Sequence, residues 1–200
     1  MCIRDRLRGV LDRAFAGEDA FTRRDIAIDD QIERFAVLGA ALTAAALPPA
    51  CEGIDLWNDT RLARTIGAFY GHQGGQAHDA RYFKTLVSNV IGSAGSWFAV
   101  SLLARLVPAS SRVANAYAST YALGKVTKMY FEKSEAVETD VLRAAFKEAK
   151  KEGLTVAKEA RAKIEAKRAE IDQLKATLDS ELDAKKIDAD TYMTKLVALD

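Results

Sequence analysis

Proline and cysteine are both scarce in this sequence of 200 residues. The three prolines are Pro48, Pro49 and Pro108, so long stretches lack the residue that most strongly interrupts a helix. The two cysteines, Cys2 and Cys51, have no paired spacing, which excludes a disulfide framework or a cysteine metal site built from one copy. We expect both thiols to stay reduced in a cytosolic compartment.

An excess of one charge and strand-forming patterns are also missing. Lys and Arg total 29 against 28 Asp and Glu, for a net charge of +1, so no strong basic field is available and we expect no nucleic-acid partner. Sustained alternation of apolar and polar residues is absent, and alanine and leucine dominate the apolar positions. The sequence therefore predicts an all-α fold, with the core built by helices.

Helical periodicity, capping residues and the three prolines together set the bounds of the expected helices. The third of these has Asn58 or Asp59 as its N-cap, and Gly71 terminates it. In chain order the helices run from Val10 to Gly17, Asp30 to Leu47, Asn58 or Asp59 to Gly71, Asp79 to Pro108, Ser110 or Ser111 to Phe131, and Thr139 or Asp140 to Gly153.

The last part of the chain differs in composition, because Ala, Lys, Glu and Arg dominate from Leu154 onward. Lys185 to Asp188 predict a turn between two helices of this charged segment. The pattern is typical of a coiled-coil-like helical hairpin that self-associates or covers its own apolar seam. The seam consists of Ile164, Ile171, Leu174, Leu178 and Leu182, and the residues expected to fold back on it are Tyr192, Leu196 and Leu199.

These patterns divide the chain into three parts. Residues 1–17 form an N-terminal segment, and Met1 to Arg6 are interpreted as an artefactual or truncated start. Residues 18–153 are expected to form the helical bundle, and residues 154–200 a projecting charged hairpin. Because the hairpin can cover its own seam, its deletion is predicted to leave the bundle folded.

Few residues suggest chemistry. His72, His78 and Asp79 could be drawn as a metal site, and a metal-dependent hydrolase using the His72–Asp79 loop is one alternative function. Asp55 and Asp59 lie one helical turn apart, but helix capping explains both better than a pair of acid and base. We therefore predict no catalytic, cofactor-binding or metal-binding residue, and a protein that is not an enzyme.

Small residues recur at steps of three and four in two neighbouring segments, which allows helix backbones to approach closely. The soluble interpretation is tight packing of an apolar helical hairpin within the bundle. The alternative is an integral membrane hairpin over residues 85–131, because residues 85–104 are uncharged over about the length that spans a bilayer. The stripe comprises Ser88, Gly92, Gly95, Ala99, Ala114, Ala118 and Ala122.

Several short motifs resemble the bacterial domain-of-unknown-function family 697, which includes YcjF-like proteins. The resemblance covers about residues 35–153 and is carried by short, mainly apolar runs. They are Ala40 to Pro49 followed by Asp55, Ile66 to Gly71, Leu106 to Pro108, Ala118 to Gly124, and Tyr130 to Glu132. Ala109 to Ser111 depart from the family pattern, in which glycines follow the proline.

The resemblance implies a helical module that attaches to membranes or to GTPases, since this domain often follows a Ras-like GTPase domain. We therefore expect a non-enzymatic accessory or scaffold module with a GTPase domain, in cis or in trans, as its partner. The membrane surface is a second expected partner. The expected location is the bacterial cytoplasm or the cytoplasmic face of the inner membrane. The C-terminal hairpin is similar to short C-terminal interaction hairpins.

Overall fold

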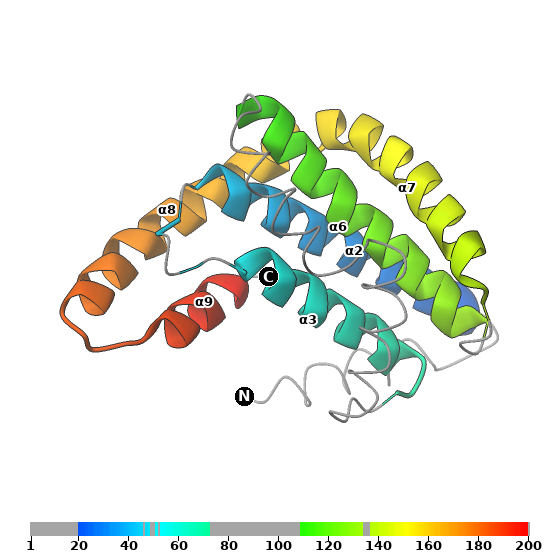
Figure 1. Ribbon diagram of the computed structural model, residues 1–200, viewed down its shortest axis with the longest axis horizontal. Helices are drawn as coiled ribbons and strands as arrows, with labels where there is room; N and C mark the ends of the chain where they lie inside the picture. The colour runs from blue at the N-terminus through cyan, green and yellow to red at the C-terminus, as the bar shows by residue number, and fades with distance from the viewer. Residues whose placement is uncertain are drawn as a thin grey trace.

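The computed structural model describes residues 20–45, 47–48, 51, 53–72, 109–133 and 137–199. Within these residues all regular secondary structure is helical, apart from a single 3-10 position at Cys51, which confirms the predicted all-α bundle. The helices are α2 (Ala20–Ala44), α3 (Ile54–Phe69), α6 (Ala109–Glu132), α7 (Thr139–Glu159), α8 (Arg161–Asp183) and α9 (Ala189–Val197) (Figure 1).

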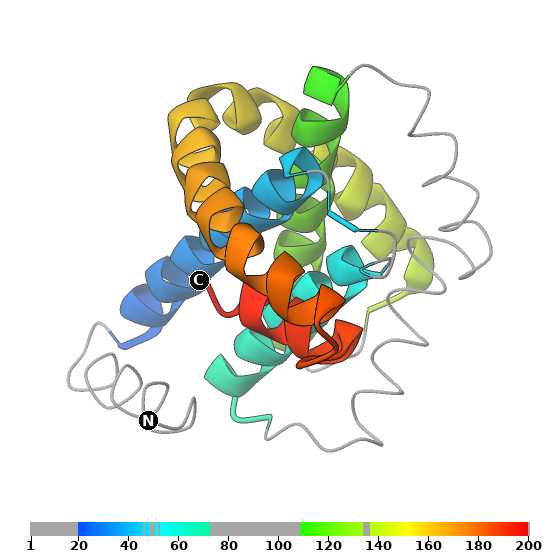
Figure 2. The same cartoon turned by 90° about the vertical axis from the view of Figure 1, so that its left-hand side faces the viewer.

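Helix α6 is the central element of the described part of the bundle. It packs against α2, α3 and α7, so three separate helices meet its faces. Helices α7 and α8 together form an arc that runs from α6 around α2, and α9 returns to lie beside α3 (Figure 2). The core therefore lies where α2, α3 and α6 cross, with the arc closing one side.

Helix α2 begins ten residues before the predicted start. Asp30 lies within the helix and pairs with Arg34 at 2.9 Å on its exposed side, so the predicted helix start at Asp30 is wrong. The apolar repeat already includes Ile28 and Ile32, both fully buried, and this burial stabilises the helix through Asp30. The helix ends at Ala44, ahead of Pro48.

Helix α3 shows how glycine bounds a helix at both ends. Gly53 precedes it with a φ of 104°, and Gly71 follows it with a φ of 82°, a region that favours glycine. The amide of Gly71 donates to the carbonyl of Ala68, and that of His72 donates to Gly67, which is the Schellman arrangement. The predicted termination at Gly71 is confirmed.

Two further predicted helix starts are also wrong. Asn58 and Asp59 lie buried in the second turn of α3, so neither is its N-cap. Helix α6 begins at Ala109, so Ser110 and Ser111 fall inside its first turn. Local spacing predicted these caps, whereas in α3 the helix begins after Gly53 and its second turn is buried.

Helix α7 opens at Thr139 as predicted, but it does not end at Gly153. Gly153 is buried in the helix, and a Cβ added there would lie 2.9 Å from the Cα of Ala118 and 3.2 Å from Cδ1 of Tyr121. This glycine therefore provides a close approach between α7 and α6, and the helix continues to Glu159. Ala160 joins α7 to α8 with helical backbone angles, and its amide donates to Val156.

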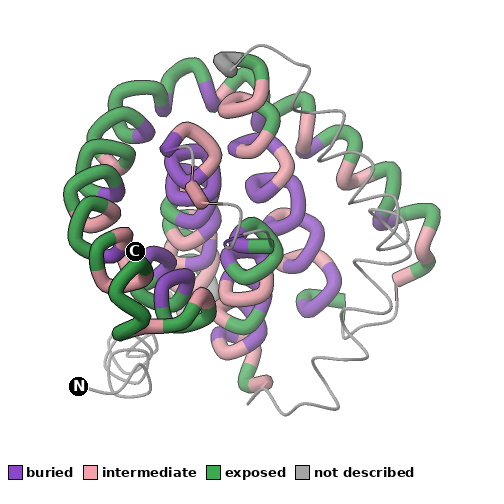
Figure 3. Tube along the Cα trace, turned by 60° about the vertical axis from the view of Figure 1, so that its left-hand side comes forward, coloured by how far each residue is buried: buried purple, intermediate pink, exposed green. Residues whose placement is uncertain are grey.

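The C-terminal hairpin has the predicted seam but packs on the rest of the bundle. Ile164, Ile171 and Leu178 are buried, and Leu174 and Leu182 are partly buried beside them. Helix α8 contacts α2, and α9 contacts α3 as well as α8, so the hairpin does not project. Figure 3 shows the outer side of the arc exposed and its inner side buried.

The turn of this hairpin follows the predicted residues. Lys185 has a φ of 55°, and the carboxylate of Asp188 accepts a hydrogen bond of 2.8 Å from the amide of Thr191, which caps α9. Tyr192 and Leu196 are fully buried, and Leu199 is partly buried against the core. The predicted fold-back of the last helix onto the seam is confirmed.

Tyr192→Phe should lower the free energy of unfolding by about 1 kcal/mol, because it removes a hydrogen bond to a carboxylate. The buried ring stays, whereas its hydroxyl no longer donates to Oδ1 of Asp179 at 2.7 Å. Urea unfolding would measure the change. A double-mutant cycle with Asp179→Ala, which removes the acceptor, should show coupling, and additive losses would mean that the bond contributes nothing to stability.

Candidate functional site

A cluster of buried polar side chains lies where α3 crosses α2 and α6. It consists of Asn58 and Asp59 from α3 and Thr120 from α6, with exposed fractions of 0%, 5% and 6%. Buried polar groups are stable only when they are hydrogen-bonded, so such a cluster places strong constraints on its neighbours. We take these three residues as the candidate site and call them the polar cluster.

Each member of the polar cluster contacts a different helix. The Thr120 hydroxyl donates to Oδ1 of Asp59 at 2.9 Å, and Nδ2 of Asn58 donates to the carbonyl of Phe35 in α2 at 3.1 Å. Gly39 leaves the space that they need: a Cβ there would lie 3.1 Å from both Nδ2 of Asn58 and Oγ1 of Thr120. The cluster therefore ties three helices together at one point.

The electrostatics of the cluster favour an uncharged carboxyl. Burial raises the pKa of Asp59 to about 7, with a further increase from nearby Asp55, while the hydrogen bond from Thr120 acts in the opposite direction. Oδ1 of Asn58 is buried and has no hydrogen-bond partner among the described residues. The chemistry that this arrangement offers is gain or loss of one proton near neutral pH.

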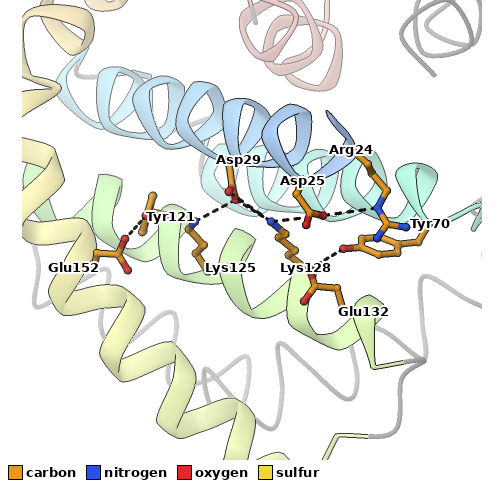
Figure 4. A network of polar contacts seen from close by, with 9 residues as sticks. All are labelled: Arg24, Asp25, Asp29, Tyr70, Tyr121, Lys125, Lys128, Glu132 and Glu152. Atoms are coloured by element: carbon orange, nitrogen blue, oxygen red, sulfur yellow. Dashed lines mark hydrogen bonds and ion pairs between the residues drawn. The ribbon is translucent and has the colours of Figure 1, made fainter. Parts of the chain in front are cut away.

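A second set of polar contacts forms a charged seam along α2 and α6 (Figure 4). Asp29 accepts from Lys125 at 3.1 Å and from Lys128 at 3.4 Å, and Lys128 lies 3.8 Å from Asp25. Lys128 is the most buried of these side chains, at 15% exposed, while both carboxylates are more than 40% exposed. Such partly exposed pairs align the two helices and contribute modestly to stability.

Tyrosines extend the charged seam to two more helices. The hydroxyl of Tyr121 donates to Glu152 of α7 at 2.6 Å, and Lys125 lies over the Tyr121 ring at 5.4 Å. At the other end, Tyr70 donates to Glu132 at 3.2 Å. Burial raises the pKa of both phenols, so both stay protonated and remain donors.

Of the three residues that could be drawn as a metal site, His72 alone is among the described residues. His72 lies against Phe131, with ring centroids 4.8 Å apart, while His78 and Asp79 are outside the described residues. The part of the chain that the structure describes contains no group of three or more His, Cys, Asp and Glu residues suited to a metal ion. The sole described cysteine, Cys51, is free and buried, and burial raises its pKa.

The predicted small-residue stripe is only partly within the described residues. Ala118 and Ala122 are fully buried in α6, and Ala118 faces Gly153 of α7. The other half of the stripe, Ser88, Gly92, Gly95 and Ala99, lies outside the described residues. Its packing against α6 stays a prediction.

Sequence reasoning named Asp59 but assigned it and Asn58 the wrong role. Capping was predicted for Asn58, Asp59 and Asp55 alike. Asp55 is exposed in the first turn of α3, whereas Asn58 and Asp59 are buried in the second. Helical spacing could have indicated that Asn58 is buried, because it precedes Leu62 and Ile66 at steps of four on the apolar face. Thr120 carries no comparable signal, since its partner lies 61 residues away.

No protein-family model, curated protein or solved structure is detectably similar to the chain. Among the described helices, none is both long and apolar enough to cross a membrane. Residues 85–108 of the alternative membrane hairpin lie outside the described residues.

Proposed function

We propose that the chain is a non-enzymatic accessory module, a helical scaffold that docks onto a Ras-like GTPase domain at the cytoplasmic face of a bacterial membrane. The observation that supports it most is spatial. Motifs that carry the resemblance to family 697 are far apart in the sequence, yet several of them pack directly on one another.

The clearest contact between two of these motifs lies where the end of α3 packs on the end of α6. A Cβ added at Gly67 would lie 3.1 Å from Cζ of Phe131, so the aromatic ring occupies the space that this glycine leaves. Tyr70 stacks on Phe131, with centroids 5.9 Å apart, and donates to Glu132. The Ile66–Gly71 and Tyr130–Glu132 motifs thus form one contact, which supports the proposal because the resemblance rests on both.

Residues of the Ala118–Gly124 motif also contact other helices. Thr120 donates to Asp59, and Gly124 faces Ile32 of α2 so closely that a Cβ would lie 2.6 Å from its Cγ1. Ala118 meets Gly153. The motifs that carry the resemblance therefore contribute to helix packing, which suits a scaffold better than a set of reacting groups.

The outer side of the α7–α8 arc offers a surface of the kind that docking needs. Its exposed residues carry both signs, for example Lys151 beside Glu148, and Arg168 between Glu165 and Asp172. Interspersed charges select a partner by complementarity and contribute little to the fold itself. A GTPase domain could use this surface without disturbing the core.

Binding of the full chain to the Ras-like GTPase domain encoded in the same or an adjacent reading frame tests the proposal. Isothermal titration calorimetry with the GDP form and with a non-hydrolysable GTP analogue should give a dissociation constant of roughly micromolar or lower, and should differ between the two forms. An unrelated Ras-like domain serves as the control. Absence of binding in both nucleotide states would contradict the GTPase part of the proposal.

The membrane part has its own test. Flotation with vesicles of phosphatidylethanolamine and phosphatidylglycerol should recover the chain in the lipid fraction, and vesicles of phosphatidylcholine alone should recover less. A chain that stays at the bottom of both gradients would limit the proposal to GTPase docking.

A further inference from the structure

The polar cluster has a property that packing alone does not require. A carboxyl that only joins two helices is usually paired with a cation or left near solvent. Asp59 is 5% exposed and, among the described residues, accepts from one neutral donor, Thr120. Ionisation of this carboxyl therefore places a charge in the core at the point where three helices meet.

In the part of the chain that the structure describes, the groups around Asp59 do not compensate such a charge. On its own helix, the charged neighbour that acts on it is Asp55, which is also acidic. Helix α6 offers the Thr120 hydroxyl, and α2 brings Gly39 and the carbonyl of Phe35 to the cluster. Helix α9 also packs on α3, but its Lys195 is paired with Glu181 of α8 at 2.8 Å.

We propose that Asp59 is a proton-operated lock on α3. When the carboxyl is protonated, α3 packs fully against α2 and α6. When the carboxyl is ionised, that packing is weaker. Gly39 and Asn58 leave little room for the cluster to rearrange, since Asn58 is fully buried and tied to α2. The charge is therefore relieved most readily by movement of α3.

The sign of the effect follows from the shift of the pKa. The folded-state pKa of Asp59, about 7, is above the ordinary value of 3.8, so the folded chain holds a proton that the unfolded chain releases. The stabilisation is complete below about pH 4 and is lost as the pH rises through 7. Near pH 6 the unfolding equilibrium constant should rise about tenfold per pH unit.

The lock gives the module a response to local pH in the neutral range. Leu56 and Trp57 are 47% and 38% exposed in the first turn of α3, just before Asp59. A surface that includes these two side chains would be well ordered at mildly acidic pH and less well ordered above neutral pH. This inference concerns the fold of α3 and holds whether or not a GTPase domain is the partner.

Asp59→Asn tests the lock, because asparagine keeps the size of the side chain and cannot ionise. In urea unfolding of the full chain, the ratio of the wild-type to the variant unfolding constant should rise about 100-fold between pH 5 and pH 8. Asp183→Asn, an exposed change on α8, should keep the wild-type pH dependence. A wild-type chain and an Asp59→Asn chain with parallel pH profiles would overturn the proposal.

A second measurement decides the matter if Asp59→Asn fails to fold. The carboxyl ¹³C chemical shift of Asp59 in the wild-type chain should titrate with a midpoint near 7. Hydrogen exchange of the α3 amides should also be faster at pH 8 than the intrinsic pH effect explains. A midpoint below 6 would overturn the lock, since the carboxylate would then be ionised throughout the neutral range.

Discussion

Gly153→Leu should lower the free energy of unfolding by about 3 kcal/mol, the upper part of the usual range for overpacking. A Cβ at this position would already lie 2.9 Å from the Cα of Ala118, and a backbone atom cannot turn away as a flexible side chain can. Separation of α7 from α6 would also stretch the hydrogen bond from Tyr121 to Glu152. Thermal or urea unfolding would measure the loss.

The control for this change is another small-to-large substitution in the same helix. Ala144→Leu lies on the exposed side of α7 and should change the stability by less than about 0.5 kcal/mol. Leucine has a higher helix propensity than glycine, by roughly 1 kcal/mol, so an exposed Gly153 would give a stabilised variant. A stabilised Gly153→Leu would show that α6 and α7 do not touch there.

Deletion of residues 160–200 should leave a chain that no longer folds cooperatively. The removed segment includes five side chains that the core buries: Ile164, Ile171, Leu178, Tyr192 and Leu196. Burial of each contributes about 1.5–3 kcal/mol, so their sum is comparable with the whole stability of a typical domain, about 5–15 kcal/mol. Circular dichroism and urea unfolding of the truncated chain would show the loss.

A point variant separates loss of packing from loss of chain length. Ile171→Ala removes one fully buried side chain from α8, and should destabilise the full chain by about 2–5 kcal/mol. A truncated chain with a sharp unfolding transition near that of the wild type would contradict this expectation. It would instead support the separable hairpin that the sequence predicts.

Apolar periodicity carried most of the prediction of the C-terminal hairpin. Ile164, Ile171 and Leu178 recur at steps of seven, and Asp188 supplies a cap at a turn. The sequence could not identify the surface that covers the seam. A narrow apolar stripe fits a second copy, its own last helix or a neighbouring helix equally well, and in the structure α2 and α9 both contact α8.

Glycine gave the least certain local signals, because one residue type has two physical uses. Gly71 ends α3 with a positive φ, whereas Gly153 sits within α7 and allows a close approach. The choice between them depends on what lies opposite, and Ala118 is 35 residues earlier in the chain. Residue type and spacing alone therefore placed the end of α7 six residues too early.

The polar cluster needed tertiary information in the same way. Asn and Asp at the start of an apolar repeat are common caps. In the structure α3 begins just after Gly53, so Asn58 and Asp59 lie in its second turn, where they are buried. Thr120 lies in a run of otherwise ordinary helical residues. Its link to Asp59 could be inferred only once α3 and α6 were known to cross.

Hydrogen exchange of the full chain at increasing urea tests most directly whether the described helices form one core. Mass spectrometry of peptides from α2 and from α8 would follow the loss of protection in each helix. We predict that both lose protection at the same urea concentration and with the same slope, because the α8 seam packs on α2. Loss of protection in α8 at a clearly lower urea concentration, with α2 still protected, would contradict a single core.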